Sequence, residues 1–287
     1  MADSQSAQDP LLAALREQMP GLFWTADRDL RITSNGGAGS APFHAGPGAL
    51  VGRTVCEFFE CADRHAAPIA AHLEALRGVS AYFEYFWRNH ILEIRIEPLR
   101  APSGQIIGCL AMAFDVTARK KWEEQTLYQA RHDALTGLAN YREFMDRLET
   151  EVRRAERAHH GFTLLLLDLD DLKRINDRRG HLAGNRALQR LAAVMNEHCR
   201  STDLAARYGG DEFAVILIDS DRGMAENVAQ RIDLRLRSAP ENPPITVSIG
   251  VGIYPDDGRS PAELIEAADR RLYQHKKSPG KRAFSAS

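Results

Sequence analysis

The chain has 287 residues, which is enough for two domains that each bury a hydrophobic core. Its 37 basic and 39 acidic residues give a net charge of −2, which argues against a general attraction to nucleic acid or to a membrane surface. The four cysteines form no CxxC pair, the N-terminus lacks the basic and apolar parts of a signal peptide, and no apolar run reaches the roughly 20 residues of a membrane span. We therefore expect a cytoplasmic protein with reduced thiols and with no nucleic-acid or membrane partner.

The first half of the chain predicts an α+β domain over residues 10–118, after a polar tail over residues 1–9 that we expect to be disordered. Short runs that favour β structure alternate with turn residues, and this pattern predicts an antiparallel sheet. Residues 34–49 predict a loop, and residues 57–77 predict an irregular to helical segment. The predicted strands are residues 22–26, 30–33, 82–87, 92–98 and 106–114.

This order of elements resembles a PAS sensory domain. The segment Asp115-Val-Thr-Ala-Arg-Lys120 is similar to the D-[IV]-T-x-R-[KR] exit through which such domains pass into a signalling helix. The resemblance implies a regulatory domain with an unknown PAS ligand or signal. His65 and His72 lie seven residues apart, so one of them could bind a haem iron in this domain. The alternative interpretation is an ordinary surface or capping histidine, which is the more frequent role of a single histidine.

Residues 119–132 predict a connector helix between the two halves. The segment is charged and carries few apolar side chains, among them Trp122, Leu127 and Tyr128. Two interpretations remain open: a solvated connector, or a helix that pairs with its copy in a dimer and transmits a twist.

The second half, residues 133–287, alternates helix-forming and strand-forming patterns. Residues 162–167 predict a buried strand, and residues 204–208 and 213–218 predict two strands around a Gly-Gly-Asp-Glu link. Apolar residues alternate strictly from 245 to 253, which predicts a further strand. With helical spacings in between, the order is βαββαβ, a ferredoxin-like or polymerase-palm plan.

Three acidic residues are expected to converge in such a sheet. Asp168 ends the buried strand, and Asp211 and Glu212 lie at the tip of the two-strand hairpin. Carboxylates this close repel and raise one another's pKa, which a divalent cation relieves. Oxygen ligands suit Mg²⁺, and two such ions activate an attacking hydroxyl and hold a leaving pyrophosphate. Gly209 and Gly210 allow positive φ in the turn and leave room for a ligand against the backbone.

The segment Asp170-Asp171-Leu172-Lys173 opens a helix directly after the buried strand. A helix N-terminus offers free N–H groups and a positive dipole end to phosphates. Lys173 and Lys276 add positive charge for a triphosphate. Because the sequence contains no GxxxxGK[ST] loop, this would be a nucleotide site of a different kind.

These residues resemble the GGDEF family of diguanylate cyclases. The family signature is matched by Arg207-Tyr-Gly-Gly-Asp-Glu-Phe213, and the likeness extends through most of residues 130–282. The resemblance implies a polymerase-palm fold of the nucleotidyl cyclase type. The further motifs, in family order, are Asp133-Ala-Leu-Thr-Gly-Leu-Ala-Asn140, Asp168-Leu-Asp-Asp-Leu-Lys-Arg-Ile-Asn-Asp177 with Gly180-His181 and Gly184, Thr246-Val-Ser-Ile-Gly-Val251, and Ala268-Asp269 with Leu272-Tyr273.

The resemblance also implies roles for single residues. Asp168, the Leu169 carbonyl and Asp211 would bind Mg²⁺ or Mn²⁺, two ions per active site, with Glu212 assisting. Asp211, Glu212 and Lys173 would be the catalytic residues. The residues assigned to the nucleotide are Asp170, Asp171, Leu172, Lys173, Asn176, Asn185, Gly209, Gly210 and Lys276.

The reaction that the resemblance implies needs two copies of the domain. Each copy would hold one GTP, and a homodimer would join the two into cyclic di-GMP with release of two pyrophosphates, mainly by positioning and charge neutralisation. Arg200-Ser-Thr-Asp203 is similar to the RxxD site through which cyclic di-GMP acts as a feedback inhibitor. An ordinary surface ion pair between Arg200 and Asp203 is the alternative.

The chain departs from the family pattern at Asn185, where the family has an aspartate that contacts guanine. An amide offers one donor and one acceptor, which also suits adenine. One hypothesis is therefore relaxed base choice with cyclic GMP-AMP as a product, and the other is that Asn185 and Asn176 still select guanine. A third interpretation, a catalytically silent nucleotide-binding regulatory module, is opposed by the intact acidic residues. There are two smaller departures. Tyr141 stands where the family often has arginine. The closing segment from Lys276 to Lys281 is one residue longer than usual, which puts a phosphate-binding role of Lys281 in doubt.

Overall fold

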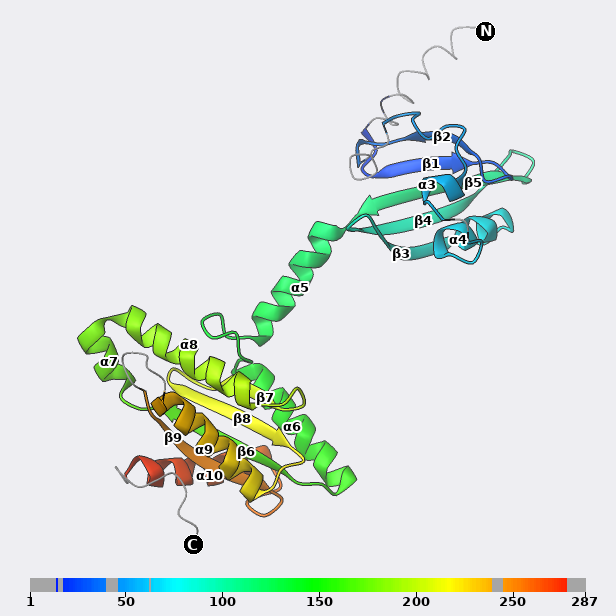
Figure 1. Cartoon of the computed structure of the whole chain (residues 1–287). Coiled ribbons are helices and arrows are strands. Elements are labelled where there is room, and N and C mark those ends of the chain that lie inside the picture. The colour runs from blue at the N-terminus through cyan, green and yellow to red at the C-terminus, as the bar shows by residue number, and fades with distance from the viewer. Residues whose placement is uncertain (1–13, 15–17, 40–45, 62, 239–244, 278–287) are drawn as a thin grey trace. The chain divides into compact units, whose positions relative to one another are not determined.

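The computed structural model divides into two compact units, residues 1–125 and residues 126–287, each described by itself (Figure 1). The tail predicted at residues 1–9 lies outside the described residues, and so does Lys281. No helix within the described ranges is long and apolar enough to cross a membrane. The structure describes residues 14, 18–39, 46–61, 63–238 and 245–277.

The first unit is built on an antiparallel sheet with the strand order β2-β1-β5-β4-β3. Helix α4 packs against β3, β4 and β5, and α3 packs against α4. The predicted PAS-like antiparallel domain is therefore confirmed. Its elements are β1 (Leu22–Ala26), β2 (Ile32–Gly36), α3 (Val55–Phe58), α4 (Ala67–Leu76), β3 (Ala81–Trp87), β4 (His90–Arg100) and β5 (Ile106–Asp115).

Strand β2 continues into the segment predicted as a loop. Its backbone pairs with β1, where Trp24 lies opposite Asn35. The Asn35 side chain is buried, donates to the Gly46 carbonyl and accepts from the Leu50 N–H. Strand pairing and a satisfied amide thus override the local preference of Asn for turns.

Aromatic side chains fill the centre of this unit. Trp24 is completely buried, and its ring lies edge-on to Phe58 and Phe59. The Trp24 Nε1–H donates to His72 Nε2 over 3.0 Å, and His72 Nδ1 lies 2.6 Å from the Pro68 carbonyl oxygen. Burial lowers the pKa of His72 to about 4, so the ring is neutral and Nδ1–H donates to that carbonyl. Both ring nitrogens are engaged, so His72 has no lone pair to offer to a haem iron.

The exit segment begins helix α5 (Thr117–Arg131). The Asp115 carboxylate accepts from the backbone N–H and the hydroxyl of Thr117, and the Thr117 hydroxyl accepts from the Ile91 N–H. None of the fifteen residues of α5, all of them described, is buried. This exposure is compatible with both interpretations of the connector, and pairing across a dimer stays a prediction.

The second unit has a four-stranded antiparallel sheet with the order β7-β8-β6-β9. Two helices, α7 and α8, join β6 to β7, and α9 joins β8 to β9, so the predicted βαββαβ plan is confirmed. Its elements are α6 (Tyr141–Ala158), β6 (Phe162–Leu169), α7 (Leu172–Arg179), α8 (His181–His198), β7 (Leu204–Arg207), β8 (Glu212–Ile218), α9 (Arg222–Ser238), β9 (Val247–Tyr254) and α10 (Pro261–Lys276).

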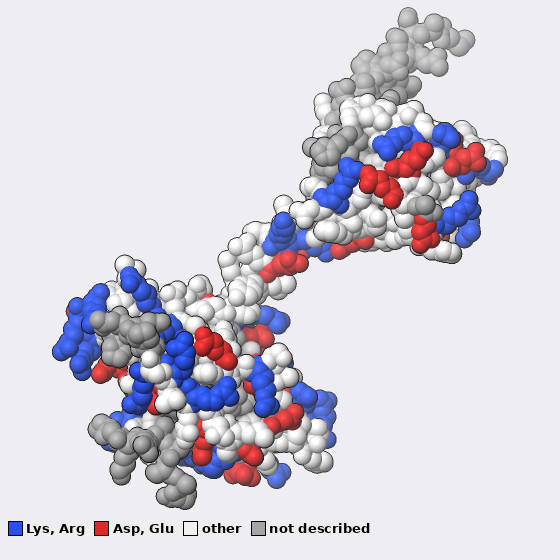
Figure 2. All heavy atoms as spheres, in the orientation of Figure 1, with Lys and Arg blue, Asp and Glu red and all other residues white. Residues whose placement is uncertain are grey.

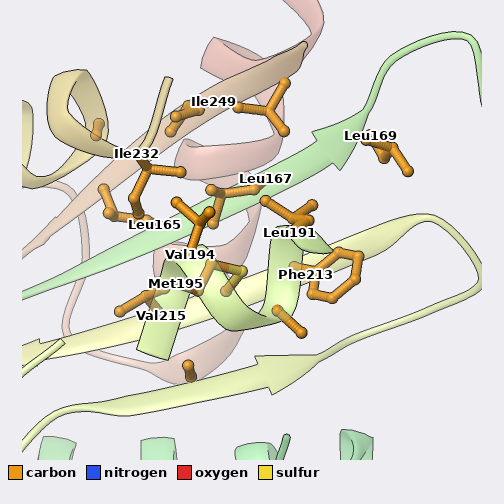
Figure 3. Close-up of a cluster of buried hydrophobic side chains, with 14 of the residues drawn as sticks. Leu165, Leu167, Leu169, Leu191, Val194, Met195, Phe213, Val215, Ile232 and Ile249 are labelled. Carbon is orange, nitrogen blue, oxygen red and sulfur yellow. The ribbon is translucent and has the colours of Figure 1, made fainter. Parts of the chain in front are cut away.

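Helices cover both faces of this sheet (Figure 1). Alternate residues of β6 serve the two layers: Leu165 and Leu167 pack with α8 and α9, as Figure 3 shows, whereas Leu164 and Leu166 pack with α6 and α10. All eight residues of β6 are buried, which explains why the sequence shows one continuous apolar run there. The run ends in Asp168 and Leu169, so a carboxylate lies where the central strand β6 leaves the core.

Candidate active site

The Gly-Gly-Asp-Glu link forms a tight turn between β7 and β8. The backbone N–H groups of Tyr208 and Gly209 both donate to the Glu212 carbonyl. Neither Gly209 nor Gly210 has a positive φ, so the turn does not use the left-handed backbone that glycine allows. A Cβ at Gly209 would lie 2.7 Å from Glu212 Oε2, the end of a flexible side chain that would have to move aside. Gly210 has open space on its side-chain face.

The sheet register brings the end of β6 beside this turn. Asp168 lies opposite Glu212, and the Leu169 N–H donates to the Asp211 carbonyl over 3.0 Å. Asp168 is only 6% exposed, and its Oδ2 lies 2.7 Å from the Nζ of Lys276, at the end of α10. A desolvated carboxylate thus contacts a lysine from near the C-terminal end of the chain, at the C-terminal end of the central strand β6.

The charges at this end of β6 are strongly coupled. Burial raises the pKa of Asp168, and the charges of Asp211 and Asp170 add to the rise, while the Lys276 ammonium opposes it. Burial disfavours the charge on Lys276, but Asp168 outweighs burial, with help from Asp211 and Glu212, so the pKa of Lys276 lies above its usual value. The negative charges of these carboxylates therefore favour a positive charge bound close to them.

The donor set suits a hard divalent cation in its chemistry. The Asp168 and Asp211 carboxylates and the Leu169 carbonyl come to one end of the sheet, and Mg²⁺ takes oxygen ligands of these kinds. Within the described residues, however, no three acidic, histidine or cysteine side chains are gathered closely enough for a metal. The predicted convergence with Glu212 therefore holds for the backbone register, but not for the side chains, and the Asp168 carboxylate pairs with Lys276.

The segment after β6 presents a helix N-terminus. Both carboxylate oxygens of Asp170 accept hydroxyl hydrogen bonds at 2.8 Å, from Ser248 of β9 and from Thr246 just before it, so this side chain anchors the loop. Asp171 has a left-handed φ of 57° and makes no side-chain cap to the described first turn of α7. The first-turn N–H groups are therefore open to an anion.

Basic side chains surround this N-terminus. Lys173 is exposed in the first turn of α7, while Leu172 is half-buried and packs on the core. Exposed Arg174, Arg178 and Arg179 continue the positive surface along the helix, and Figure 2 shows it at this end of the unit. The segment thus combines oriented N–H groups with positive charge, as a polyphosphate site needs.

Asn176 and Asn185 lie on α7 and on the first turn of α8. The Asn176 Oδ1 is buried without a hydrogen-bond partner among the described residues. A Cβ at Gly184 would lie only 1.9 Å from this oxygen, so the glycine makes room for the amide. Asn185 is exposed. An unpaired buried acceptor is costly in isolation, and a ligand N–H would satisfy it.

The family model described as "Diguanylate cyclase, GGDEF domain" matches residues 130–282, more than half of the chain. The chain belongs to the GGDEF family. A second model, of the PAS fold, matches residues 17–121. The resemblance drawn from the sequence motifs is thus confirmed for both halves.

GGDEF proteins from several bacteria are similar to this chain. The probable diguanylate cyclase DgcE of Escherichia coli is 35% identical over 186 residues, which are 63% of this chain and 17% of DgcE. The response regulator PleD of Caulobacter vibrioides is 36% identical over 162 residues, 54% of this chain and 36% of PleD. The chain spans less than half of the length of the curated relatives it matches.

A solved structure has the same fold as the second unit. The coiled coil and GGDEF domain of DgcB from Caulobacter crescentus, in complex with c-di-GMP, is similar with a TM-score of 0.52 and 29% identity. The likeness covers 56% of this chain and 88% of that one.

A cavity of about 470 Å³ lies beside the RxxD segment of the GGDEF domain. Asp203 Oδ2 accepts from the Arg200 backbone N–H at 2.8 Å, and Oδ1 accepts from the Ile218 N–H at 3.1 Å. The Asp203 carboxylate therefore holds the turn between α8 and β7. Arg200 and Arg231 both line the cavity, so two guanidinium groups border one space.

A half-buried ion pair beside the GGDEF turn was not anticipated from the sequence. Arg207 NH1 donates to both carboxylate oxygens of Asp133 at 3.1 Å, while Nε and NH2 donate to the Gly210 carbonyl at 3.2 and 2.7 Å. Burial opposes the charge on Asp133, but hydrogen bonds from Thr136 and Arg207 outweigh it and hold the pKa of Asp133 below its usual value. Both residues belong to motifs noted in the sequence, yet only the fold shows that they meet.

Proposed function

We propose that this protein is a diguanylate cyclase, which condenses two GTP molecules into cyclic di-GMP and releases two pyrophosphates. The observation that carries the proposal is the register of β6 and β8, which places buried Asp168 opposite Glu212 and beside the open N-terminus of α7. Membership of the GGDEF family supports the same activity. The PAS-like unit would regulate it through a signal or ligand that no residue identifies.

A divalent cation, Mg²⁺ or Mn²⁺, would be held by Asp168, the Leu169 carbonyl and Asp211 with help from Glu212, and two ions per active site would neutralise phosphate charge and activate the 3′-hydroxyl. The chain's own groups position the nucleotide. The first-turn N–H groups of α7 and Lys173 would face the phosphates, and Lys276 would add a positive charge. Because positioning and charge neutralisation dominate phosphoryl transfer, these groups suffice without a general base of unusual pKa.

One GGDEF domain supplies only half of the reaction. Each site holds one nucleotide, so the 3′-hydroxyl of one GTP reaches the α-phosphate of the other only when two copies face each other, and we propose a homodimer. The cavity bordered by Arg200 and Arg231 would take cyclic di-GMP as a feedback inhibitor, since paired guanidinium groups suit its phosphates and guanine edges. The c-di-GMP complex of DgcB supports this choice of ligand.

The selection of the nucleotide base is the point at which a specific observation favours a second product. Asn176 Oδ1 is a buried acceptor and fits the N–H groups of guanine. Asn185, however, presents both a donor and an acceptor on the exposed start of α8, and this pair also fits the adenine edge. Cyclic GMP-AMP is therefore the alternative product.

The test is to incubate the purified protein with Mg²⁺ and equal amounts of GTP and ATP, and to identify the cyclic dinucleotides by mass. We expect cyclic di-GMP and pyrophosphate. Asp211→Ala should keep the fold, because a half-buried turn carboxylate adds little to the core, but should lose pyrophosphate release. A substantial fraction of cyclic GMP-AMP would make Asn185 the specificity residue, and Asn185→Asp should then restore guanine selection.

Two results would count against the proposal. Normal turnover by Asp211→Ala would show that the metal site is assigned wrongly. Tight GTP binding without any pyrophosphate release, in protein freed of bound dinucleotide and across a range of protein concentrations, would favour the silent regulatory module.

A further inference from the structure

The ion pair between Asp168 and Lys276 uses a carboxylate that the proposed metal site needs. Lys276 Nζ lies 2.7 Å from Asp168 Oδ2, and the Asp168 side chain is only 9% exposed. Lys276 also interacts with the charges of Asp211 and Glu212, so its ammonium is influenced by all three acidic residues proposed as metal ligands. The lysine is thus the cation that balances these acidic residues in the described structure.

The ammonium and a divalent ion cannot share this carboxylate without cost. Mg²⁺ binds oxygen at about 2.0–2.1 Å, so an ammonium hydrogen-bonded to the same Asp168 carboxylate would lie within a few ångströms of it. Repulsion between a charge of two and a charge of one at such a distance is large in a partly buried site.

The position of Lys276 allows its ammonium to move away from Asp168. Its side chain is 41% exposed, whereas that of Asp168 is nearly closed off. It ends α10, whose last turn contacts β9 through His275 and β6 through Lys276 itself. The four-carbon stem of a lysine is flexible, so the ammonium can move away without a shift of the core. A nearby triphosphate presents more negative charge than one carboxylate and competes for the ammonium.

We infer that Lys276 couples metal binding to nucleotide binding by competing with the divalent cation for Asp168. Without nucleotide the ammonium holds Asp168 and weakens metal binding; the triphosphate draws the ammonium away and frees the carboxylate. Metal and nucleotide therefore strengthen each other's binding, because such coupling is reciprocal. The nucleotide part of this inference rests on the proposed function, but the competition at Asp168 does not.

The experiment measures binding of Mn²⁺ alone, by electron paramagnetic resonance, to the full chain without nucleotide. Lys276→Met removes the competing ammonium, and we expect Mn²⁺ to bind about tenfold more tightly, as expected when one charge-assisted contact is removed. The matched control is Lys277→Met. It removes one positive charge from the next position, where Lys277 Nζ lies over the Tyr273 ring at 4.1 Å. The control should stay within about twofold of wild type, since an exposed charge is screened by solvent and salt.

Lys276→Gln serves as a second variant, because it removes the charge without adding an apolar side chain, and it should give the same gain. If both Lys276 variants bind Mn²⁺ no more tightly than Lys277→Met, the inference is wrong. In a second arm, a non-hydrolysable GTP analogue should tighten Mn²⁺ binding by a larger factor in wild type than in Lys276→Met; equal factors would also overturn it. The first arm contains no nucleotide, so it tests the competition for Asp168 independently of the proposed function. Tighter Mn²⁺ binding by the Lys276 variants without any GTP turnover by the wild type would refute only the cyclase activity. Full GTP turnover without tighter Mn²⁺ binding would refute only the competition between Lys276 and the metal.

Discussion

The contact between Arg207 and Asp133 predicts how the GGDEF turn is held in place. Arg207 uses three nitrogens: one bonds both oxygens of Asp133 and two bond the Gly210 carbonyl, next to the proposed ligand Asp211. In Arg207→Lys a single ammonium cannot reach both partners, because the fork of the guanidinium is lost. The charge remains, so the variant isolates geometry from electrostatics.

The size of the effect follows from the exposure of the pair. Hydrogen bonds to charged groups contribute about 1.5–3 kcal/mol each. Arg207 has two partners, Asp133 and the Gly210 carbonyl, and lysine keeps one of them. The side chains of Arg207 and Asp133 are 16% and 22% exposed, which places the contribution of each partner at the lower end of this range. We therefore expect the free energy of unfolding of the second unit to fall by about 1.5 kcal/mol. Turnover should fall at least about tenfold, since a shift of the turn misplaces the groups that bind the phosphates.

The assay separates the two units. All three tryptophans lie in residues 1–125, so tryptophan fluorescence during urea unfolding follows the first unit, while circular dichroism follows both. The control is Arg270→Lys, whose exposed pair with Glu266 should change stability by less than about 0.5 kcal/mol. If Arg207→Lys matched this control in both stability and turnover, the turn would not depend on the guanidinium fork.

Two further predictions concern buried positions. His72 has a folded-state pKa of about 4 against its ordinary 6.5, so it stabilises the first unit fully above about pH 6.5, and about 3 kcal/mol is lost as pH falls to 4. His72→Gln should remove this part of the pH dependence in unfolding followed by tryptophan fluorescence, and an unchanged slope would contradict the assignment. Gly184→Ala should force Asn176 aside and weaken GTP binding by about tenfold in calorimetry, while the better helix propensity of alanine limits the loss of stability to about 1 kcal/mol. Unchanged GTP affinity would mean that the Asn176 amide does not contact the base.

The backbone of the site could be predicted because it follows from patterns that act locally. The apolar run of β6 stops at Asp168, and two strands around a short glycine-containing link must form a hairpin. Pairing β6 with β8 then sets the register, because a slip of one residue would turn buried side chains outward. The position of Asp168 opposite Glu212 is thus a consequence of burial. The PAS-like half was likewise predictable as strands, but the pairing of the polar segment around Asn35 was not, since its hydrogen bonds come from residues far along the chain.

The side-chain partners at the site could not be predicted, because each depends on a contact between distant segments. Asp170 follows Asp168 in the same motif, yet its carboxylate is taken by two hydroxyls in and just before β9, 76 and 78 residues away. Lys276 was expected to face phosphates, and its contact with Asp168 appears only when α10 is packed beside β6. The motif states which charges are present, and the packing decides which of them neutralise each other. A family motif alone therefore does not distinguish a metal-ready site from one that a lysine keeps closed, and the Mn²⁺ affinities of the Lys276 variants measure that difference directly.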